Sequence, residues 1–302
     1  MDIGLLMLVG GFAAGVFGSL LGLGGGILIV PLLTLGFGLD LRAAVGVSLV
    51  CVIMTSSAAA GVYLERHVAN LRLGMSLELF TAIGALVGGS IAFLVDERFL
   101  SVLFAVLLGY VAFSMVRGSA SEVTTAEGAD TDAASDVIAH RPRESGAVAP
   151  ASRAMAVTGV APSPPGLRTA FLASVGGPGY EVRNLGRGIV GASGAGVVSA
   201  LLGIGGGIVK VPLMHLTMGV PLRVATATSN LMIGITAAAS AVIYLLRGEI
   251  DPYVAGPTAI GVFLGATLGS RVAHRIPLRY LRLLFVVVMV YTAIQMLLRA
   301  TS

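Results

Sequence analysis

Charged residues are scarce in this sequence: Asp, Glu, Lys and Arg together make up 11% of its 302 residues. Soluble domains carry about 25% charge, so this scarcity excludes a water-soluble globular protein. Hydrophobic residues make up 56% of the chain, and the mean hydropathy is +0.95. These values predict a polytopic protein whose partner is the lipid bilayer. The single cysteine, Cys51, excludes an internal disulfide.

Motifs of enzymes and of nucleic-acid binding are also missing. No His/Cys cluster has metal-ligand spacing, no Gly-x-Ser-x-Gly element is present, and no Walker sequence is present. We therefore expect no enzyme activity, no cofactor, no metal site and no ATP site. The net charge of +4 does not indicate nucleic acid, because the basic residues are scattered between apolar segments.

Glycine, in contrast, is abundant and unevenly placed. Gly22-Leu23-Gly24-Gly25-Gly26 interrupts the apolar run Ile3–Phe37, and Gly203-Ile204-Gly205-Gly206-Gly207 interrupts a second run. Both segments are followed at the same distance by a proline, Pro31 and Pro212. Each glycine weakens a helix by about 1 kcal/mol relative to alanine. Two such interruptions at matching positions predict a pair of broken membrane helices, which in transporters form substrate sites.

The two glycine segments belong to an internal repeat with a constant, ungapped offset of 181 residues, the spacing from Gly22 to Gly203. The matches extend from the first apolar run to the end of each half. They include Gly15 with Gly196, Arg42 with Arg223, Ser48 with Ser229, Tyr63 with Tyr244, Gly84 with Gly265, Gly88 with Gly269, Phe104 with Phe285, and Met115 with Met296. We therefore predict a first membrane repeat at 1–117, a mostly disordered cytoplasmic linker at 118–187 and a second membrane repeat at 188–302.

The distribution of Lys and Arg predicts the orientation of the repeats. If the glycine-interrupted run is a re-entrant hairpin, three spans follow it in the first repeat (43–64, 73–95 and 99–116), and most basic residues fall on one side of the membrane. If that run crosses fully, no clear bias results. The first arrangement predicts an all-α fold of two inverted repeats, each a broken re-entrant helix plus three transmembrane helices. It gives six full crossings with both termini outside.

The glycine segments are the predicted binding site. The half-helix that begins after each segment presents free amide groups and a positive dipole end, which suit an anion. The second span of each repeat supplies polar side chains, and Lys210 is a cation at membrane depth. The predicted substrate-binding residues are Gly24, Gly25, Gly26, Ser48, Gly205, Gly206, Gly207, Lys210, Thr228, Ser229 and Asn230.

Other interpretations of these residues stay open at this point. The glycines can serve close helix crossing, the hydroxyls can bond to their own helix carbonyls, and Lys210 can extend to the membrane interface. Arg42 and Arg223 begin the second spans at equivalent positions. We expect them to attract anions into vestibules or to act in gating; the alternative is a topology-setting charge.

These motifs resemble the sulfite exporter TauE/SafE family. Its pattern combines Gly-x-Gly-Gly-Gly and a following proline in each half with a small-Thr-Ser element in the next helix. That element is complete in the second half, at Ala227-Thr228-Ser229, whereas the first half has Val47 before Ser48. The departure weighs against a hydroxyl contribution from position 47. The resemblance covers about 11–117 and 192–298 but not the linker.

The resemblance implies a secondary transporter that exports a small anion, sulfite or an organosulfur anion, by alternating access. We expect a multi-pass protein of the inner (plasma) membrane, and a homodimer is compatible with the sequence. A passive anion channel or a non-transporting scaffold would share the same features. The sequence does not identify the anion, the coupling ion or the direction of transport.

Overall fold

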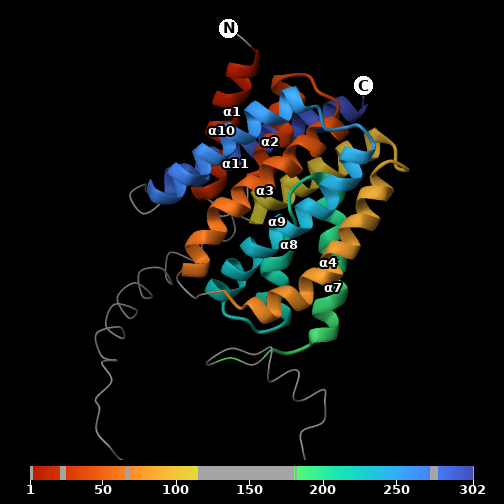
Figure 1. Cartoon of the computed structure of the whole chain (residues 1–302). Helices are drawn as coiled ribbons and strands as arrows, with labels where there is room; N and C mark the ends of the chain where they lie inside the picture. Colours follow the sequence, from red (N-terminus) through yellow and green to blue (C-terminus); the bar gives the residue numbers. More distant parts are fainter. Residues whose placement is uncertain are drawn as a thin grey trace, which may run out of the picture.

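The computed structural model describes residues 3–20, 25–65, 69–114, 180, 182–272 and 278–301. Regular secondary structure in these ranges is helical (Figure 1). The first repeat contains α1 (Ile3–Leu20), α2 (Gly26–Pro31), η1 (Leu32–Gly36), α3 (Leu41–Glu65), α4 (Leu71–Ala92) and the helix Glu97–Ser114. The second contains α7 (Leu185–Leu202), α8 (Gly207–Pro212), η3 (Leu213–Thr217), α9 (Leu222–Leu246), α10 (Pro252–Val272) and α11 (Leu278–Thr301).

Within the described ranges, five helical segments are long and apolar enough to cross a membrane. They are Leu41–Ala58, Leu71–Ala92, Glu97–Ser114, Leu185–Leu202 and Val224–Leu246. Their outer faces are apolar as well: α4 exposes Met75, Leu79 and Ile83, which recur every four residues along one side. Such a face is unfavourable in water and suited to lipid. The fold is that of a polytopic membrane protein, as the composition predicts.

A short helix begins at the end of each glycine segment, and the second segment also ends the helix before it. Gly203, Gly205 and Gly206 have positive φ angles of 68°, 79° and 76°, and Gly25 has a φ of 73°. A side chain in this left-handed region costs roughly 1–2 kcal/mol, which explains why glycine occupies these positions. Gly24 lies outside the described residues. The predicted interruption of two helices is therefore present, with α2 and α8 beginning directly after Gly25 and Gly206.

The prolines that follow the glycines mark a second irregularity. Pro31 ends α2 and Pro212 ends α8, and each short helix continues directly into a π-helical turn, η1 or η3. Proline has no backbone N–H and displaces the carbonyl four residues earlier. A wider turn after it accommodates this missing hydrogen bond. The half-helices are consequently short and irregular, unlike the continuous helices around them.

The two repeats interlock through their first and fourth helical segments. The most extensive contacts between elements are α1 with α10 and α4 with α7, so each repeat's first helix packs on the other repeat. Glycines make these crossings close: Gly15 faces the carbonyl of Val262, and at the equivalent place Gly196 faces the carbonyl of Thr81. Each crossing thus reproduces the other at the 181-residue offset between Gly15 and Gly196.

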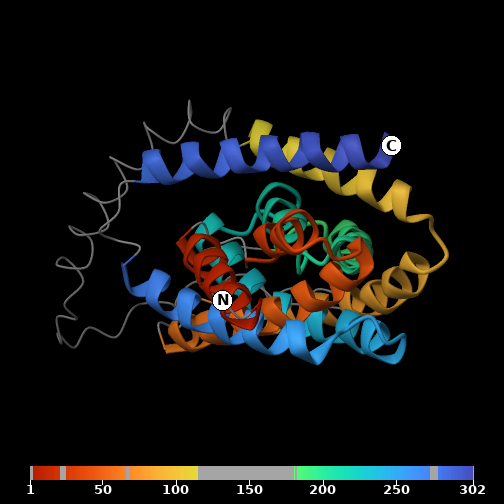
Figure 2. The same cartoon turned by 90° about the horizontal axis from the view of Figure 1, so that it is seen from above.

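The first helix of each repeat, α1 or α7, lies towards the centre of the molecule. Figure 2 shows α11 and the helix Glu97–Ser114 along one edge, with α1 and α7 lying inward from them. The opposite edge is formed by α3, α4, α9 and α10. The glycine-containing segments therefore lie in the interior of the helical assembly. Most residues of the predicted linker, and residues 273–277, lie outside the described residues.

The α4–α7 crossing gives a prediction on stability. A Cβ atom at Gly84 would overlap the carbonyl oxygen of Ser193 on α7, so Gly84→Ala forces two backbones apart. Overpacking of this kind costs about 1–3 kcal/mol, which thermal unfolding in detergent would detect as a lower Tm. Gly109→Ala is the matched control, because a Cβ there meets nothing within 4 Å. A Tm of Gly84→Ala equal to that of the control would contradict the close crossing.

Candidate functional site

The two glycine segments meet in the interior of the protein. Ser48 of α3 is fully buried, and its Oγ lies 2.8 Å from the carbonyl oxygen of Gly203 and 3.2 Å from that of Gly26. A Cβ at Gly26 would lie 2.6 Å from the Gly203 carbonyl oxygen. The backbones of the two repeats are therefore in direct contact, and the Ser48 hydroxyl donates a hydrogen bond that the two carbonyl groups share. This places two predicted residues, Gly26 and Ser48, beside the glycine segment that begins at Gly203.

The second glycine segment is surrounded by buried polar groups. Gly206 packs against the Cβ atom of Ser199 and the Cε atom of Lys210, and Gly207 lies beside the hydroxyl of Ser229. The hydroxyls of Ser199 and Ser229 are buried and have no hydrogen-bond partner in the described part of the chain. An unsatisfied buried hydroxyl carries a desolvation cost of about 1–3 kcal/mol. Two of them beside one lysine indicate a place where a polar ligand or water binds.

Lys210 forms a buried ion pair. Its Nζ atom lies 3.1 Å from Oε2 of Glu78 on α4 and 2.5 Å from Oγ1 of Thr236 on α9. The Thr236 hydroxyl in turn lies 2.6 Å from Oε1 of Glu78. The side chains of Lys210 and Glu78 are 1% and 5% exposed. Lys210 thus lies in the interior and does not extend to an interface, and three helices of both repeats hold this triad.

The other repeat has no such triad. At the 181-residue offset, Lys210 corresponds to Ile29 and Glu78 to Ala259, while Thr236 corresponds to Thr55. Ile29 and Ala259 are both buried in the main apolar core. The internal duplication therefore contains two equivalent places, one charged and one apolar.

The remaining predicted residues of α9 contact the first repeat. The Thr228 hydroxyl accepts a hydrogen bond from the backbone N–H of Asn70 at 3.0 Å. The backbone carbonyl of Asn230 accepts one from the Ser56 hydroxyl at 2.6 Å, and Asn230 is 7% exposed. These contacts fix α9 against α3 and the start of α4. Thr228 and Asn230 therefore lie in the interface between the repeats.

Arg42 lies apart from the glycine segments. Its Nη2 atom donates to the backbone carbonyl of Val95 at 2.8 Å, and its guanidinium carbon lies 5.7 Å from the centre of the Phe93 ring. Arg42 thus fastens the start of α3 to the end of α4. Arg223 lies in the first turn of α9, but its side chain is outside the described part. The structure does not bring Arg42 to Lys210 or Ser229, and its vestibule role stays a prediction.

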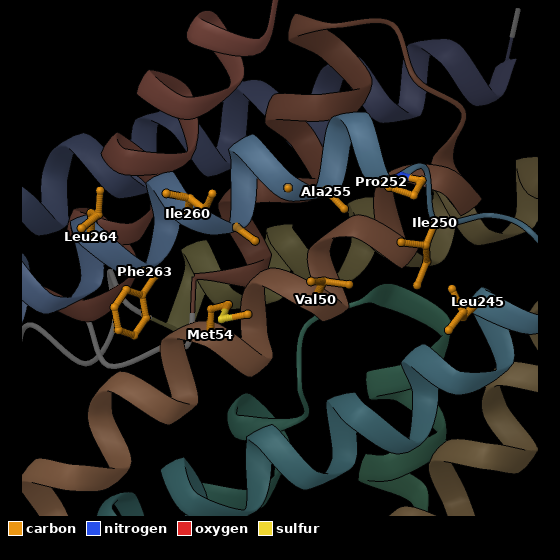
Figure 3. Close-up of a pocket in the computed structure, with 11 residues that line it drawn as sticks. Val50, Met54, Leu245, Ile250, Pro252, Ala255, Ile260, Phe263 and Leu264 are labelled. Atoms are coloured by element: carbon orange, nitrogen blue, oxygen red, sulfur yellow. The ribbon is translucent and has the colours of Figure 1, made fainter.

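The larger hollows on the surface do not suit an anion. The groove in Figure 3, of about 540 Å³, is lined only by apolar residues of α3, α9, α10 and the loop before α10, including Met54, Phe263 and Leu264. A smaller hollow of about 260 Å³ contains the carboxylates of Asp40 and Glu97 and the guanidinium of Arg98. Two acids against one base make it unfavourable for a negative ligand. Neither of these two hollows therefore replaces the glycine segments as the predicted anion site.

Glu78, Thr236 and Ser199 are parts of the site that the sequence reasoning missed. Glu78 is the one acidic residue in the apolar stretch 73–95. An ionisable residue inside a membrane span is by default a functional candidate, so this signal was available. Its pairing with Lys210 could not be predicted from the sequence, because 132 residues separate the two. Within the described part, no group of three or more His, Cys, Asp or Glu side chains could hold a metal ion.

Comparisons with known proteins agree with this architecture. The model of one protein family, Sulfite exporter TauE/SafE, matches residues 7–296. The probable membrane transporter protein YunE of Bacillus subtilis is 24% identical over 301 residues, which cover 97% of each chain. Sulfite exporter TauE/SafE family protein 6 of Arabidopsis thaliana is 34% identical over 98 residues, 32% of this chain and 23% of the relative. No solved structure matches the chain.

Proposed function

Because the chain belongs to the sulfite exporter TauE/SafE family, we propose that it is a secondary transporter for a small anion, sulfite or an organosulfur anion. The proposed transport is export across the inner (plasma) membrane by alternating access. The family and the full-length similarity to a probable membrane transporter support the transporter class. The identity of the anion rests on the family alone. The site described above supports an anionic substrate independently.

We further propose that the two repeats are inverted. In Figure 1, α1 begins near the top of the view and α7, its equivalent, begins near the bottom. The reciprocal packing of α1 on α10 and of α7 on α4 supports a two-fold relation between the repeats. Inverted repeats allow a central site to open to either side when one set of helices moves against the other. In this proposal the linker at 118–187 is cytoplasmic, and the broken helices are re-entrant.

The single observation that carries the anion site is the polar environment of Gly206. Lys210 and Ser199 pack against Gly206, Ser229 lies beside Gly207, and the two serine hydroxyls have no partner in the described part of the chain. These polar groups surround one glycine segment in the buried interior of the protein. An oxyanion with several acceptor oxygens satisfies all of them at once. Ser48, Thr228 and Asn230 then hold the two repeats around the site.

The proposal is tested on purified protein in liposomes with a panel of sulfite, sulfate, thiosulfate and sulfonates. A carrier gives saturable flux that a counter-substrate on the opposite side stimulates. Single-channel conductance would instead favour a passive anion channel. Absence of flux for every anion of the panel, from protein that is folded, contradicts the proposed function.

Ser229→Ala tests the position of the site. Removing a hydroxyl that donates to a charged group costs about 1.5–3 kcal/mol, so we expect the KM for the transported anion to rise about tenfold or more. Ser57→Ala is the control, since the Ser57 hydroxyl is exposed and bonds to the carbonyl of Ile53 on its own helix. Flux assays at several anion concentrations separate KM from the maximal rate. An unchanged KM in Ser229→Ala places the anion elsewhere.

A further inference from the structure

The buried triad of Glu78, Lys210 and Thr236 is not needed for packing. Replacing a buried ion pair by apolar side chains of similar volume is often neutral or stabilising, because burial removes the hydration of both charges. The equivalent place at the 181-residue offset is apolar in the same chain, with Ile29 of the first repeat and Ala259 of the second buried in the apolar core. Stability alone therefore does not account for the charged pair. The position of this ion pair beside the second glycine segment indicates a role in transport.

The charges around Glu78 balance without a substrate. Lys210 contributes one positive charge and Glu78 one negative charge, and the triad as a whole is neutral. The elements packed on α4 add no further charge at this depth in the described part. Arg72 and Arg187 are exposed near the starts of α4 and α7, Arg223 lies in the first turn of α9, and Tyr244 of α9 donates to the carbonyl of Ala200.

A bound anion would disturb this balance. It would compete with Glu78 for Lys210, and two negative groups would then share one buried lysine. In a medium of low dielectric constant this excess charge is strongly unfavourable. A proton on Glu78 restores neutrality and frees Lys210 for the anion. The geometry therefore links the binding of one negative charge to the binding of one proton.

We propose that Glu78 is a proton-binding site that couples proton movement to anion movement, one for one. This inference rests on the proposed transport function. On loading, Oε2 of Glu78 takes a proton from the water of the loading side and forms an O–H bond, and the ion pair between Glu78 and Nζ of Lys210 breaks. The Lys210 ammonium then pairs with an oxygen of the anion, while Thr236 Oγ1 remains within reach of both side chains. On release the carboxylate loses the proton and pairs with Lys210 again.

This mechanism specifies the energetics of transport. For a singly charged oxyanion, the loaded site carries no net charge, so translocation is electroneutral. A membrane potential does not drive it, whereas a pH difference does. Efflux from liposomes loaded with the anion is accelerated when the inside is acid and slowed when the outside is acid.

The experiment measures both ions with wild-type protein in liposomes loaded with a sulfonate from the panel, using a pH dye and an anion assay at a clamped membrane potential. A sulfonate is singly charged and does not itself bind or release protons near neutral pH, so the dye reports only the protons that the protein moves. We expect close to one proton per anion. Anion efflux without proton movement overturns the coupling and leaves the transport function intact. Absence of anion efflux overturns the transport function and the coupling with it.

Glu78→Gln, which removes the titrating group and keeps its shape, identifies the residue. We expect the proton-to-anion ratio to fall from about one towards zero and the acceleration by inside acid to disappear. Asp251→Asn is the matched control, because this exposed carboxylate only accepts from the N–H of Tyr253, which asparagine also does. A Glu78→Gln protein that still moves one proton per anion overturns the assignment. If this variant does not fold, proton uptake by detergent-solubilised wild-type protein on adding the same sulfonate decides the coupling, and its absence overturns the proposal.

Discussion

Lys210→Ala is expected to abolish anion flux and to lower the free energy of unfolding by about 3–5 kcal/mol. The variant leaves the carboxyl group of Glu78 buried without its cation, and it removes the positive charge of the proposed anion site. Flux in liposomes and unfolding in mixed detergent micelles measure the two effects separately. Wild-type flux in a folded Lys210→Ala protein would show that the anion does not use this lysine.

A double variant separates the structural effect from the transport effect. Lys210→Met combined with Glu78→Leu replaces the ion pair by apolar side chains of similar volume; the equivalent positions, Ile29 and Ala259, are apolar as well. We expect the free energy of unfolding to return to within about 1 kcal/mol of wild type, because neither charge is left unpaired. Anion flux should remain absent. If flux returned together with stability, the pair would be structural and the proposed site would be wrong.

Gly26→Ala is expected to reduce anion flux to background. A Cβ at this position would lie 2.6 Å from the carbonyl oxygen of Gly203 and 2.7 Å from Cγ2 of Val52. The valine can turn aside, but the carbonyl is backbone and is held by Ser48. The two glycine segments must therefore separate, which costs about 1–3 kcal/mol as overpacking. Flux per folded protein, with folding checked by size-exclusion chromatography, measures the result.

Gly36→Ala is the matched control for this variant. Gly36 ends the same irregular half-helix, and a Cβ there meets only Cδ1 of Leu32 at an ordinary distance of 3.8 Å. We expect this control to retain both flux and Tm. A second variant adds Val52→Ala to Gly26→Ala, which removes the side-chain clash and leaves the backbone clash. Full recovery in that double variant would show that contact between the glycine segments is unimportant.

The sequence predicted the class of fold and the interrupted helices because both depend on local composition. Long apolar segments are sufficient to identify membrane helices, and glycines at positive φ angles are required where α2 and α8 begin. The duplication also predicted which parts are equivalent. Ser48 and Ser229, chosen as a matched pair, indeed lie at the two glycine segments, although only Ser48 has found hydrogen-bond acceptors there.

The pairing of Glu78 with Lys210 could not be predicted in the same way. The two residues belong to different repeats, and their contact depends on how α4, α8 and α9 pack. Periodicity does not encode this packing. The vestibule role of Arg42 is likewise predicted only from its position at the start of a helix. Its hydrogen bond to the carbonyl of Val95 could not be predicted, because it depends on where the following helix ends. Pairwise contacts of this kind require the tertiary structure.

The reciprocal packing of α1 on α10 and of α4 on α7 has a consequence for biosynthesis. The glycine face of α7 finds α4 already synthesised when it emerges from the ribosome. The glycine face of α1 must wait for α10, which begins only at Pro252. Until α10 emerges, this face contacts lipid or the insertion machinery, although other parts of α1 already pack on α2 and α3. A chain truncated before α10 would therefore leave the glycine face of its first helix uncovered.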